Sequence, residues 1–311
     1  MKNLILISFS AVLLTMCLMV SCTKDDPKPA VLKSILVKTL PVKIKYYTGE
    51  SLDLSGLVIT LSFDNSTTEE VNFSDFANKG ITCLPENGEI ITETSTGVTI
   101  THTSSKKKAI LAITIMVLTD IDDNTYSHVS IGNQIWMAEN LKVTKFNDNT
   151  AIPPVAEHDE WDNSATPAYC WYNNDEATYS DMYGALYNWY TIETGRLCPD
   201  GWHVPSHTEW DHLKDFLSAN GHEETEGATL RATNGWLSGV MGTDDYGFAA
   251  LPGGYRGNGE FGLAGRYGYW WSSTEYSPSQ GKLRIIMDLN DLFLSDYNSK
   301  NLGVSVRCLK D

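Results

Sequence analysis

The stretch Leu197-Cys198-Pro199-Asp200-Gly201-Trp202-His203-Val204-Pro205-Ser206-His207-Thr208-Glu209-Trp210 contains the clearest local structural signal of this chain. Its last residues predict the start of a helix, because Ser206 and Glu209 have the spacing of a capping box, in which each side chain accepts a hydrogen bond from the other residue's backbone amide. The helix is predicted to end at Gly221 after an apolar stripe, which comprises Trp210, Leu213, Phe216 and Leu217.

A second helix is predicted upstream, over residues 181–194, where Leu186, Trp189 and Tyr190 have helical spacing and Gly195 follows. From Gly235 onward, glycine and aromatic residues alternate with short β-prone segments at 269–273, 283–288 and 303–309. Helices followed by loop-rich β-structure predict an α+β fold for this part of the chain.

The composition changes sharply near residue 119. All nine Trp residues lie after it, whereas residues 31–119 contain short alternating or apolar stretches separated by turn-prone residues, at 34–44, 57–63, 68–73, 97–102 and 109–118. Such strands without a helical period predict an all-β sandwich. Because the chain is also longer than one typical core can serve, we expect two domains, 31–119 and 120–311.

The acidic run Asp120-Ile121-Asp122-Asp123-Asn124 has the composition of a calcium loop. An EF-hand loop requires Gly at its sixth position and Glu at its twelfth, where this chain has Thr125 and Ile131. We therefore interpret the run as a linker between the two domains.

Residues 1–21 predict a secretory signal peptide, because Lys2 precedes an apolar run over 4–20. The sequence Met19-Val20-Ser21-Cys22 resembles the lipobox of bacterial lipoproteins, which implies acylation of Cys22 and a tether over 22–30. The Lys24-Asp25-Asp26 triplet is similar to the signal that exports Bacteroidota lipoproteins to the outer face. We therefore expect a lipid-anchored outer-membrane protein displayed on the cell surface; the alternative is a plain solvated linker on a protein that faces the periplasm.

The net charge of −16 argues against binding to nucleic acid and against charge-driven binding to anionic lipid, so the lipid anchor is the only expected membrane contact. It leaves a neutral ligand such as a sugar open. Without a C-x-x-C pair, the cysteines predict no metal knuckle. In an oxidising compartment any two that meet would form a disulfide, and three pairings are open for the four beyond Cys17 and Cys22, which are Cys83, Cys170, Cys198 and Cys308.

The N-terminal half carries a family resemblance in the segment Tyr47-Thr48-Gly49-Glu50-Ser51-Leu52-Asp53-Leu54-Ser55-Gly56-Leu57-Val58, followed by Phe63-Asp64-Asn65-Ser66-Thr67. These residues resemble the bacterial Ig-like domains that are common in surface proteins. The resemblance implies that this domain acts mainly as a spacer.

The C-terminal half resembles the Fibrobacter succinogenes major paralogous domain, called FISUMP, from about Asp120 to its end. The resemblance rests on an ordered series of segments, which includes Ile131-Gly132-Asn133-Gln134-Ile135-Trp136-Met137-Ala138-Glu139-Asn140-Leu141, Tyr183-Gly184-Ala185-Leu186-Tyr187-Asn188-Trp189, Leu251-Pro252-Gly253-Gly254-Tyr255-Arg256 and Tyr269-Trp270-Trp271-Ser272-Ser273-Thr274-Glu275.

Residues 203–210 and the closing Ser305-Val306-Arg307-Cys308 are also similar to the C-type-lectin-like and formylglycine-generating-enzyme superfamily. That similarity implies a compact α+β fold whose ligand surface is built from long irregular loops. It also implies a disulfide between Cys198 and Cys308, which would leave Cys83 and Cys170 unpaired.

The sequence contains parts of several known catalytic and metal-binding motifs, but none of these motifs is complete. The enzyme branch of that superfamily uses a close pair of cysteines, but Cys308 has no partner after Trp271. Residues 257–262 match G-x-G-x-x-G in letters, yet a glycine-rich loop follows where a helix is required, and the glycines of 235–239 are misplaced for a nucleophile elbow. The spacing of His203, His207 and His212 does not suit zinc. No spacing selects a glycosidase pair among Asp244, Asp245, Glu275, Asp288 and Asp291.

Aromatic and amide-rich loops remain as the candidate site. Sugars present apolar C–H faces and hydroxyl groups, so their sites combine aromatic rings with hydrogen-bonding side chains. Tyr255, Arg256, Asn258, Trp271, Glu275 and Tyr276 supply this chemistry. In ligand-binding members of the superfamily that this domain resembles, the segment before the last strands carries the site. The resemblance therefore implies ligand-binding residues at 256–258, 271–276 and 288–291, the last including Asp288 and Asp291. A second candidate patch, with calcium as its candidate ion, comprises Tyr172, Asn173, Asn174 and Asp175. The competing interpretation of Trp270 and Trp271 is that they belong to the core.

These features together predict a cell-surface lipoprotein that binds a glycan or a protein without catalysis. A glycan-active surface hydrolase and a structural subunit of a fimbria-like assembly are the alternatives. A close carboxylate pair in a pocket would favour the hydrolase, and strand pairing along an open sheet edge would favour the subunit. An open, aromatic-lined loop surface would favour the binding protein.

Overall fold

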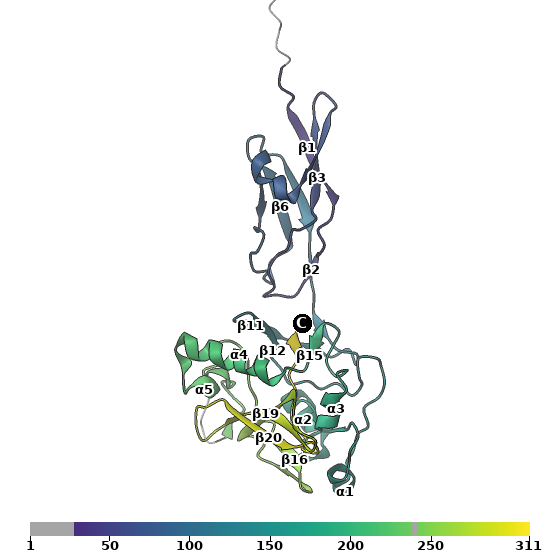
Figure 1. Cartoon of the computed structure of the whole chain (residues 1–311), viewed down its shortest axis with the longest axis vertical. Coiled ribbons are helices and arrows are strands. Elements are labelled where there is room, and N and C mark those ends of the chain that lie inside the picture. Colours follow the sequence, from purple (N-terminus) through teal and green to yellow (C-terminus); the bar gives the residue numbers. More distant parts are fainter. Residues whose placement is uncertain (1–27, 238–241) are drawn as a thin grey trace, which may run out of the picture.

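The computed structural model describes residues 28–237 and 242–311, so the predicted signal peptide and Cys22 lie outside the described residues. The chain forms two bodies joined end to end (Figure 1). The N-terminal domain lies at one end, and residues 28–31 lead into its first strand at the end of the domain that faces away from the C-terminal domain. In the C-terminal domain, α1 (His158–Asp162) and β16 (Tyr255–Gly257) lie at the far end of the molecule.

The N-terminal domain is a β-sandwich of two three-stranded sheets. One has the order β1 (Leu32–Thr39), β3 (Val58–Phe63), β4 (Thr68–Asn72), and the other has the order β5 (Ile81–Leu84), β6 (Gly97–His102), β7 (Lys108–Ala112). The short helices η1 (Phe73–Asp75) and η2 (Ala77–Lys79) connect them. Alternate residues such as Ile59 and Ile100 are fully buried between the sheets. The prediction of an all-β sandwich is confirmed.

The junction between the domains differs from the prediction. Strand β2 (Lys45–Tyr46) pairs in parallel with β8 (Thr114–Ile115), and β9 (Leu118–Thr119) pairs with β10 (Thr125–Tyr126). Only Met116 and Val117 therefore separate the last pairing of the first domain from the second domain, whose core includes Leu118 and Tyr126.

The predicted linker 120–124 is instead a tight turn of the C-terminal domain. Asp120 is buried, and its Oδ1 accepts hydrogen bonds from the amides of Asp122 and Asn124, at 2.9 and 3.0 Å. The hydroxyl of Tyr126 donates to its Oδ2 at 2.5 Å. The acidic residues at this turn therefore organise the backbone, which explains why a run with the composition of a linker is well structured.

The C-terminal domain contains two main sheets. One sheet has the order β11 (His128–Ile131), β12 (Gln134–Met137), β21 (Leu309–Lys310), β15 (Trp202–His203) and faces the N-terminal domain. The other has the order β18 (Tyr267–Ser277), β19 (Gln280–Met287), β20 (Leu294–Ser299) and lies farther away (Figure 1). The strands predicted at 269–273 and 283–288 lie in β18 and β19. The strand predicted at 303–309 is mostly a series of isolated bridges, for example from Ser305 to Trp270.

The helix α4 (His207–Leu217) begins with both hydrogen bonds of the predicted capping box, between Ser206 and Glu209. The predicted helix over 181–194 is wrong. Helix α2 (Glu176–Tyr183) ends at Gly184, whose φ of 71° and ψ of −167° no helix allows, and β14 (Leu186–Tyr187) and α3 (Trp189–Glu193) follow. The remaining elements are α1 (His158–Asp162), β13 (Tyr169–Cys170), η3 (Tyr172–Asn174), η4 (Ser218–His222), α5 (Glu226–Leu230), β16 (Tyr255–Gly257) and β17 (Glu260–Gly262).

A disulfide joins Cys198 to Cys308, with Cα atoms 6.0 Å apart, and so ties the first half of the C-terminal domain to its last segment. Cys83 and Cys170 are free. Within the described ranges, no helix has both the length and the apolar character needed to cross a bilayer.

Candidate functional site

Arg256 is part of the core and not of a ligand surface. Its side chain is 1% exposed, and its guanidinium donates to the carbonyl oxygens of Val155 and Ala156. The same group lies over the rings of Trp161, at 4.5 Å, and Phe261, at 5.0 Å. Arg256 therefore fastens the loop before α1 to the β16–β17 hairpin, and its predicted role in ligand contact is corrected.

Trp271 is also a core residue. Both Trp270 and Trp271 are fully buried, on opposite faces of β18, and each belongs to a different hydrophobic cluster. The indole of Trp271 donates to the carbonyl of Tyr187 at 2.8 Å, and that of Trp270 donates to Asn140 Oδ1 at 2.8 Å. The prediction that Trp271 offers a ring face to a ligand is wrong, because both faces of this strand are covered.

The predicted carboxylates are engaged in ion pairs. Glu275 pairs with Lys300 at 2.6 Å, Asp288 pairs with Arg266 at 3.0 Å, and Asp291 pairs with Arg231. Asp288 is buried, so it too is corrected as a ligand-facing residue. These pairs fix the loops around the β18–β20 sheet.

The second predicted patch has mainly local structural roles. Asp175 is the N-cap of α2 and accepts a hydrogen bond from the Thr178 amide at 3.1 Å, and Asn174 donates to the carbonyl of Ala156 at 3.0 Å. Tyr172 packs against Phe261 with the ring centroids 5.4 Å apart, whereas Asn173 is exposed. No group of three His, Cys, Asp or Glu side chains in residues 28–237 and 242–311 could hold a metal ion, so calcium gains no support at this patch.

His203 and His207, two of the histidines considered as zinc ligands, contact different partners. His203 lies 2.6 Å from Asp311 Oδ1 and 3.0 Å from Glu209 Oε1, and His207 lies 3.0 Å from the Ser295 hydroxyl. Burial, with the nearby charge of Arg284, lowers the pKa of His207 to about 4.

Two exposed tyrosines form an aromatic surface of the kind expected for a binding protein. Tyr276 of β18 and Tyr297 of β20 stack with ring centroids 3.8 Å apart and an interplanar angle of 8°. They are 49% and 44% exposed, more than any other Phe, Tyr or Trp side chain of the described residues. Tyr276 was predicted, but Tyr297 was missed because the two tyrosines come together only when β18 and β20 both pair with β19.

A polar hollow of about 140 Å³ is lined by Asn298, the residue that follows Tyr297 on β20, but by neither tyrosine. Its other amide side chains belong to Asn301 and to the predicted Asn258, which lies in the turn of the β16–β17 hairpin. Asn258 and Gly259 have φ values of 52° and 74°, as a two-residue hairpin turn requires. The glycines of 257–262 therefore shape a hairpin. Tyr255, on β16, is half buried against Tyr269. We call Tyr276, Tyr297, Asn258, Asn298 and Asn301 the distal face.

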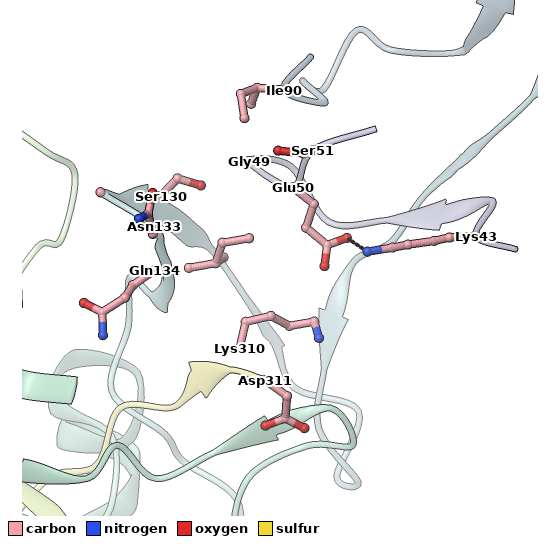
Figure 2. A pocket seen from close by; sticks show the side chains of 12 residues that line it. Lys43, Gly49, Glu50, Ser51, Ile90, Ser130, Asn133, Gln134, Lys310 and Asp311 are labelled. Atoms are coloured by element: carbon pink, nitrogen blue, oxygen red, sulfur yellow. Dashed lines mark ion pairs between the residues drawn. The ribbon is translucent and has the colours of Figure 1, made fainter. Parts of the chain in front are cut away.

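A larger groove, of about 430 Å³, lies between the two domains and was not predicted. Figure 2 shows Lys43 and Glu50 of the Ig-like domain on one side, with Ser130, Asn133 and Gln134 of the β11–β12 hairpin across from them. Lys43 and Glu50 form an ion pair at 2.9 Å. The groove's cationic and anionic side chains balance, and Lys310 and Asp311 close its base.

Beside this groove, Tyr47 inserts into the core of the C-terminal domain. It is 8% exposed, and its ring makes edge contacts with Trp202 and His128, both at 5.4 Å. Thr48 Oγ1 lies 2.7 Å from His128 Nε2, and a Cβ on Gly49 would lie 1.7 Å from Ser130 Oγ. These contacts hold the two domains in one arrangement.

Comparison with known families agrees with this division. The family model for the Fibrobacter succinogenes major domain matches residues 129–310, which is more than half of the chain. The model for the bacterial Ig-like domain (group 3) matches residues 39–101. No curated protein gives a significant match. This chain therefore belongs to the Fibrobacter succinogenes major domain family and carries a group 3 bacterial Ig-like domain ahead of that domain.

Proposed function

We propose that this protein is a cell-surface lipoprotein that binds glycans, without catalysis, through the distal face of a C-type-lectin-like domain. The observation that carries the proposal is the stacked pair Tyr276 and Tyr297, the two most exposed aromatic side chains of the described residues. A sugar ring packs its C–H face on such rings while neighbouring amides hydrogen-bond its hydroxyl groups. Asn298, the residue after Tyr297 on β20, lines a polar hollow together with Asn258 and Asn301 and supplies amides in the same part of the domain.

The arrangement of the domains supports display of this face. The chain enters at the outer end of the Ig-like domain, while the β16 hairpin lies at the opposite end of the molecule (Figure 1). An Ig-like spacer fixed by Tyr47 would therefore hold the distal face away from a membrane. The α+β order and the Cys198–Cys308 disulfide support the C-type-lectin-like assignment.

Outer-membrane anchoring and outward display rest on the sequence. Cys22 with its lipobox-like context supports acylation, and Lys24-Asp25-Asp26 supports export to the outer face. The group 3 Ig-like domain, a type common in bacterial surface proteins, is consistent with both.

The alternatives have less support. Glu275, Asp288 and Asp291 are each held by a basic partner, which disfavours a hydrolase built on them. Along the edge strand β20, the amides of Tyr297 and Ser299 donate to the side chains of the preceding residues at 2.9 and 2.8 Å, which leaves them less available to an added strand. This favours a binding module over a subunit that assembles by strand pairing.

The test is a glycan array probed with a soluble chain that starts at residue 28 and keeps both domains. We expect binding to a defined glycan set that Tyr297→Ala and Asn298→Ala abolish. The control is Leu289→Ala, which removes an apolar side chain that is 65% exposed, more than Tyr297, from another loop of the same domain. Binding of no glycan, together with capture of a protein through the same tyrosines, would replace the glycan with a protein ligand.

A further inference from the structure

A second hollow, of about 210 Å³, lies on the side of the C-terminal domain. Its wall combines Trp171 with residues of three other segments: Asn124 in the turn after β9, Lys142, and Glu176 and Ser180 on α2. It shares no lining residue with the distal face. Sequence reasoning selected the next four residues, 172–175, and missed Trp171 itself.

Trp171 is held in place and is only partly covered. Its ring makes an edge contact with Tyr169, at 5.6 Å and 82°, and packs against the main core cluster. Within the described part of the chain its indole N–H makes no hydrogen bond, although both buried tryptophans of β18 donate theirs. Trp171 therefore has an apolar surface and one polar donor available at the hollow.

The polar wall contains both engaged and unengaged groups. Lys142 pairs with Asp181 at 2.6 Å, and Asp122 accepts hydrogen bonds from the amide and hydroxyl of Thr144. By contrast, no hydrogen bond or ion pair occupies the carboxylate of Glu176 or the hydroxyl of Ser180 among the described residues, and Glu176 is exposed. The free groups are one strong acceptor and one hydroxyl beside an aromatic ring.

We infer that this hollow is a separate binding site for an uncharged pyranose ring. The ring's C–H face would pack on Trp171, and a pair of its hydroxyl groups would donate to the Glu176 carboxylate and accept from Ser180 or from the indole N–H. Lys142 pairs with Asp181 and Lys145 pairs with Asp122, so the carboxylate of Glu176 leaves one negative charge in excess at the hollow. This charge disfavours sugars that carry a carboxylate or sulfate.

The test follows the indole N–H resonance of Trp171 by two-dimensional NMR of the ¹⁵N-labelled two-domain chain, with the resonance assigned through Trp171→Phe. Neutral hexoses and N-acetylhexosamines are the probes, and glucuronate is the charged control. We expect a saturable shift of this resonance with at least one neutral sugar and none with glucuronate. Glu176→Gln should weaken that binding about tenfold, the effect of losing one charge-assisted hydrogen bond.

Glu176→Gln alters only an exposed side chain and so keeps the test valid even if Trp171→Phe folds poorly. Glu157→Gln, at another exposed position in the same domain, is the matched control and should leave binding unchanged. No shift with any neutral sugar, or an equal shift with glucuronate, would overturn the inference. Sugar binding that is lost in Tyr297→Ala but unchanged in Glu176→Gln would overturn this site and leave the distal face standing.

Discussion

Replacing Tyr47 with alanine would remove the side chain through which the Ig-like domain completes the core of the C-terminal domain. Tyr47 is 8% exposed and contacts Trp202 and His128 at 5.4 Å each. Truncation of a buried aromatic side chain costs about 3–5 kcal/mol. Because Tyr47 lies at the margin of the core, we expect about 3 kcal/mol. For a domain of this size that corresponds to a decrease in Tm of about 6–12 °C.

The positions of the tryptophans make the assay selective. All nine lie after residue 119, so tryptophan fluorescence follows the unfolding of the C-terminal domain alone, while far-ultraviolet circular dichroism follows both domains. In the unaltered protein the two signals should change together. In Tyr47→Ala the fluorescence midpoint should fall first and the transitions should separate.

Val42→Ala is the matched control, since Val42 is 85% exposed on the same domain. Its midpoints should equal those of the unaltered protein. If the fluorescence midpoint of Tyr47→Ala equals that of Val42→Ala, Tyr47 does not complete the C-terminal core and the account of the junction is refuted.

Three further outcomes are expected. Cys198→Ser opens a loop of 110 residues and should lower the free energy of unfolding by about 4–5 kcal/mol, measured by urea titration without reductant. The unaltered protein, once its disulfide is reduced, should have the same free energy of unfolding as this variant. Burial lowers the pKa of His207 from 6.5 to about 4, so this residue takes up a proton at a higher pH in the unfolded chain than in the folded one. The free energy of unfolding should therefore fall by roughly 1–2 kcal/mol, after allowance for solvent screening, as the pH drops from 6.5 to 4. His207→Gln should show a smaller loss in the same titration. Gly49→Ala should destabilise the junction, because the φ of Gly49 is 89° and the new Cβ would lie 1.7 Å from Ser130 Oγ. Adding Ser130→Gly to this variant should restore only part of the thermal midpoint. Complete restoration would mean that backbone strain at residue 49 is negligible.

The sequence predicted an element correctly where the contacts that form it join residues close together in the chain. The capping box of α4 involves residues three positions apart, so it was visible in the sequence. The helix predicted at 181–194 failed because Gly184 adopts a φ of 71° and releases the next residues to pair with β13. The turn at Asp120 resembled a linker because its partner, the hydroxyl of Tyr126, is recognisable only once the chain has folded.

The candidate site was harder to predict because burial depends on distant segments. Trp271 had the right chemistry for sugar contact, but the carbonyl of Tyr187 and the opposite cluster around Trp270 enclose β18 on both faces. Tyr297 lay outside the predicted set because it reaches Tyr276 only through strand pairing. Residue chemistry and the superfamily resemblance together pointed to the segment that forms β18, but neither indicates which of its side chains are accessible.

The two-residue junction of Met116 and Val117 also affects how well several copies of this protein could bind one ligand together, because it fixes the orientation of the C-terminal domain. A hinged head would lose rotational entropy each time it aligned with a ligand, whereas a head whose orientation is set during folding has already lost it. If the protein is anchored to a surface as proposed, neighbouring copies would each offer a binding domain that is already fixed against its spacer, which raises the effective concentration for a repetitive, polyvalent ligand without any additional contact.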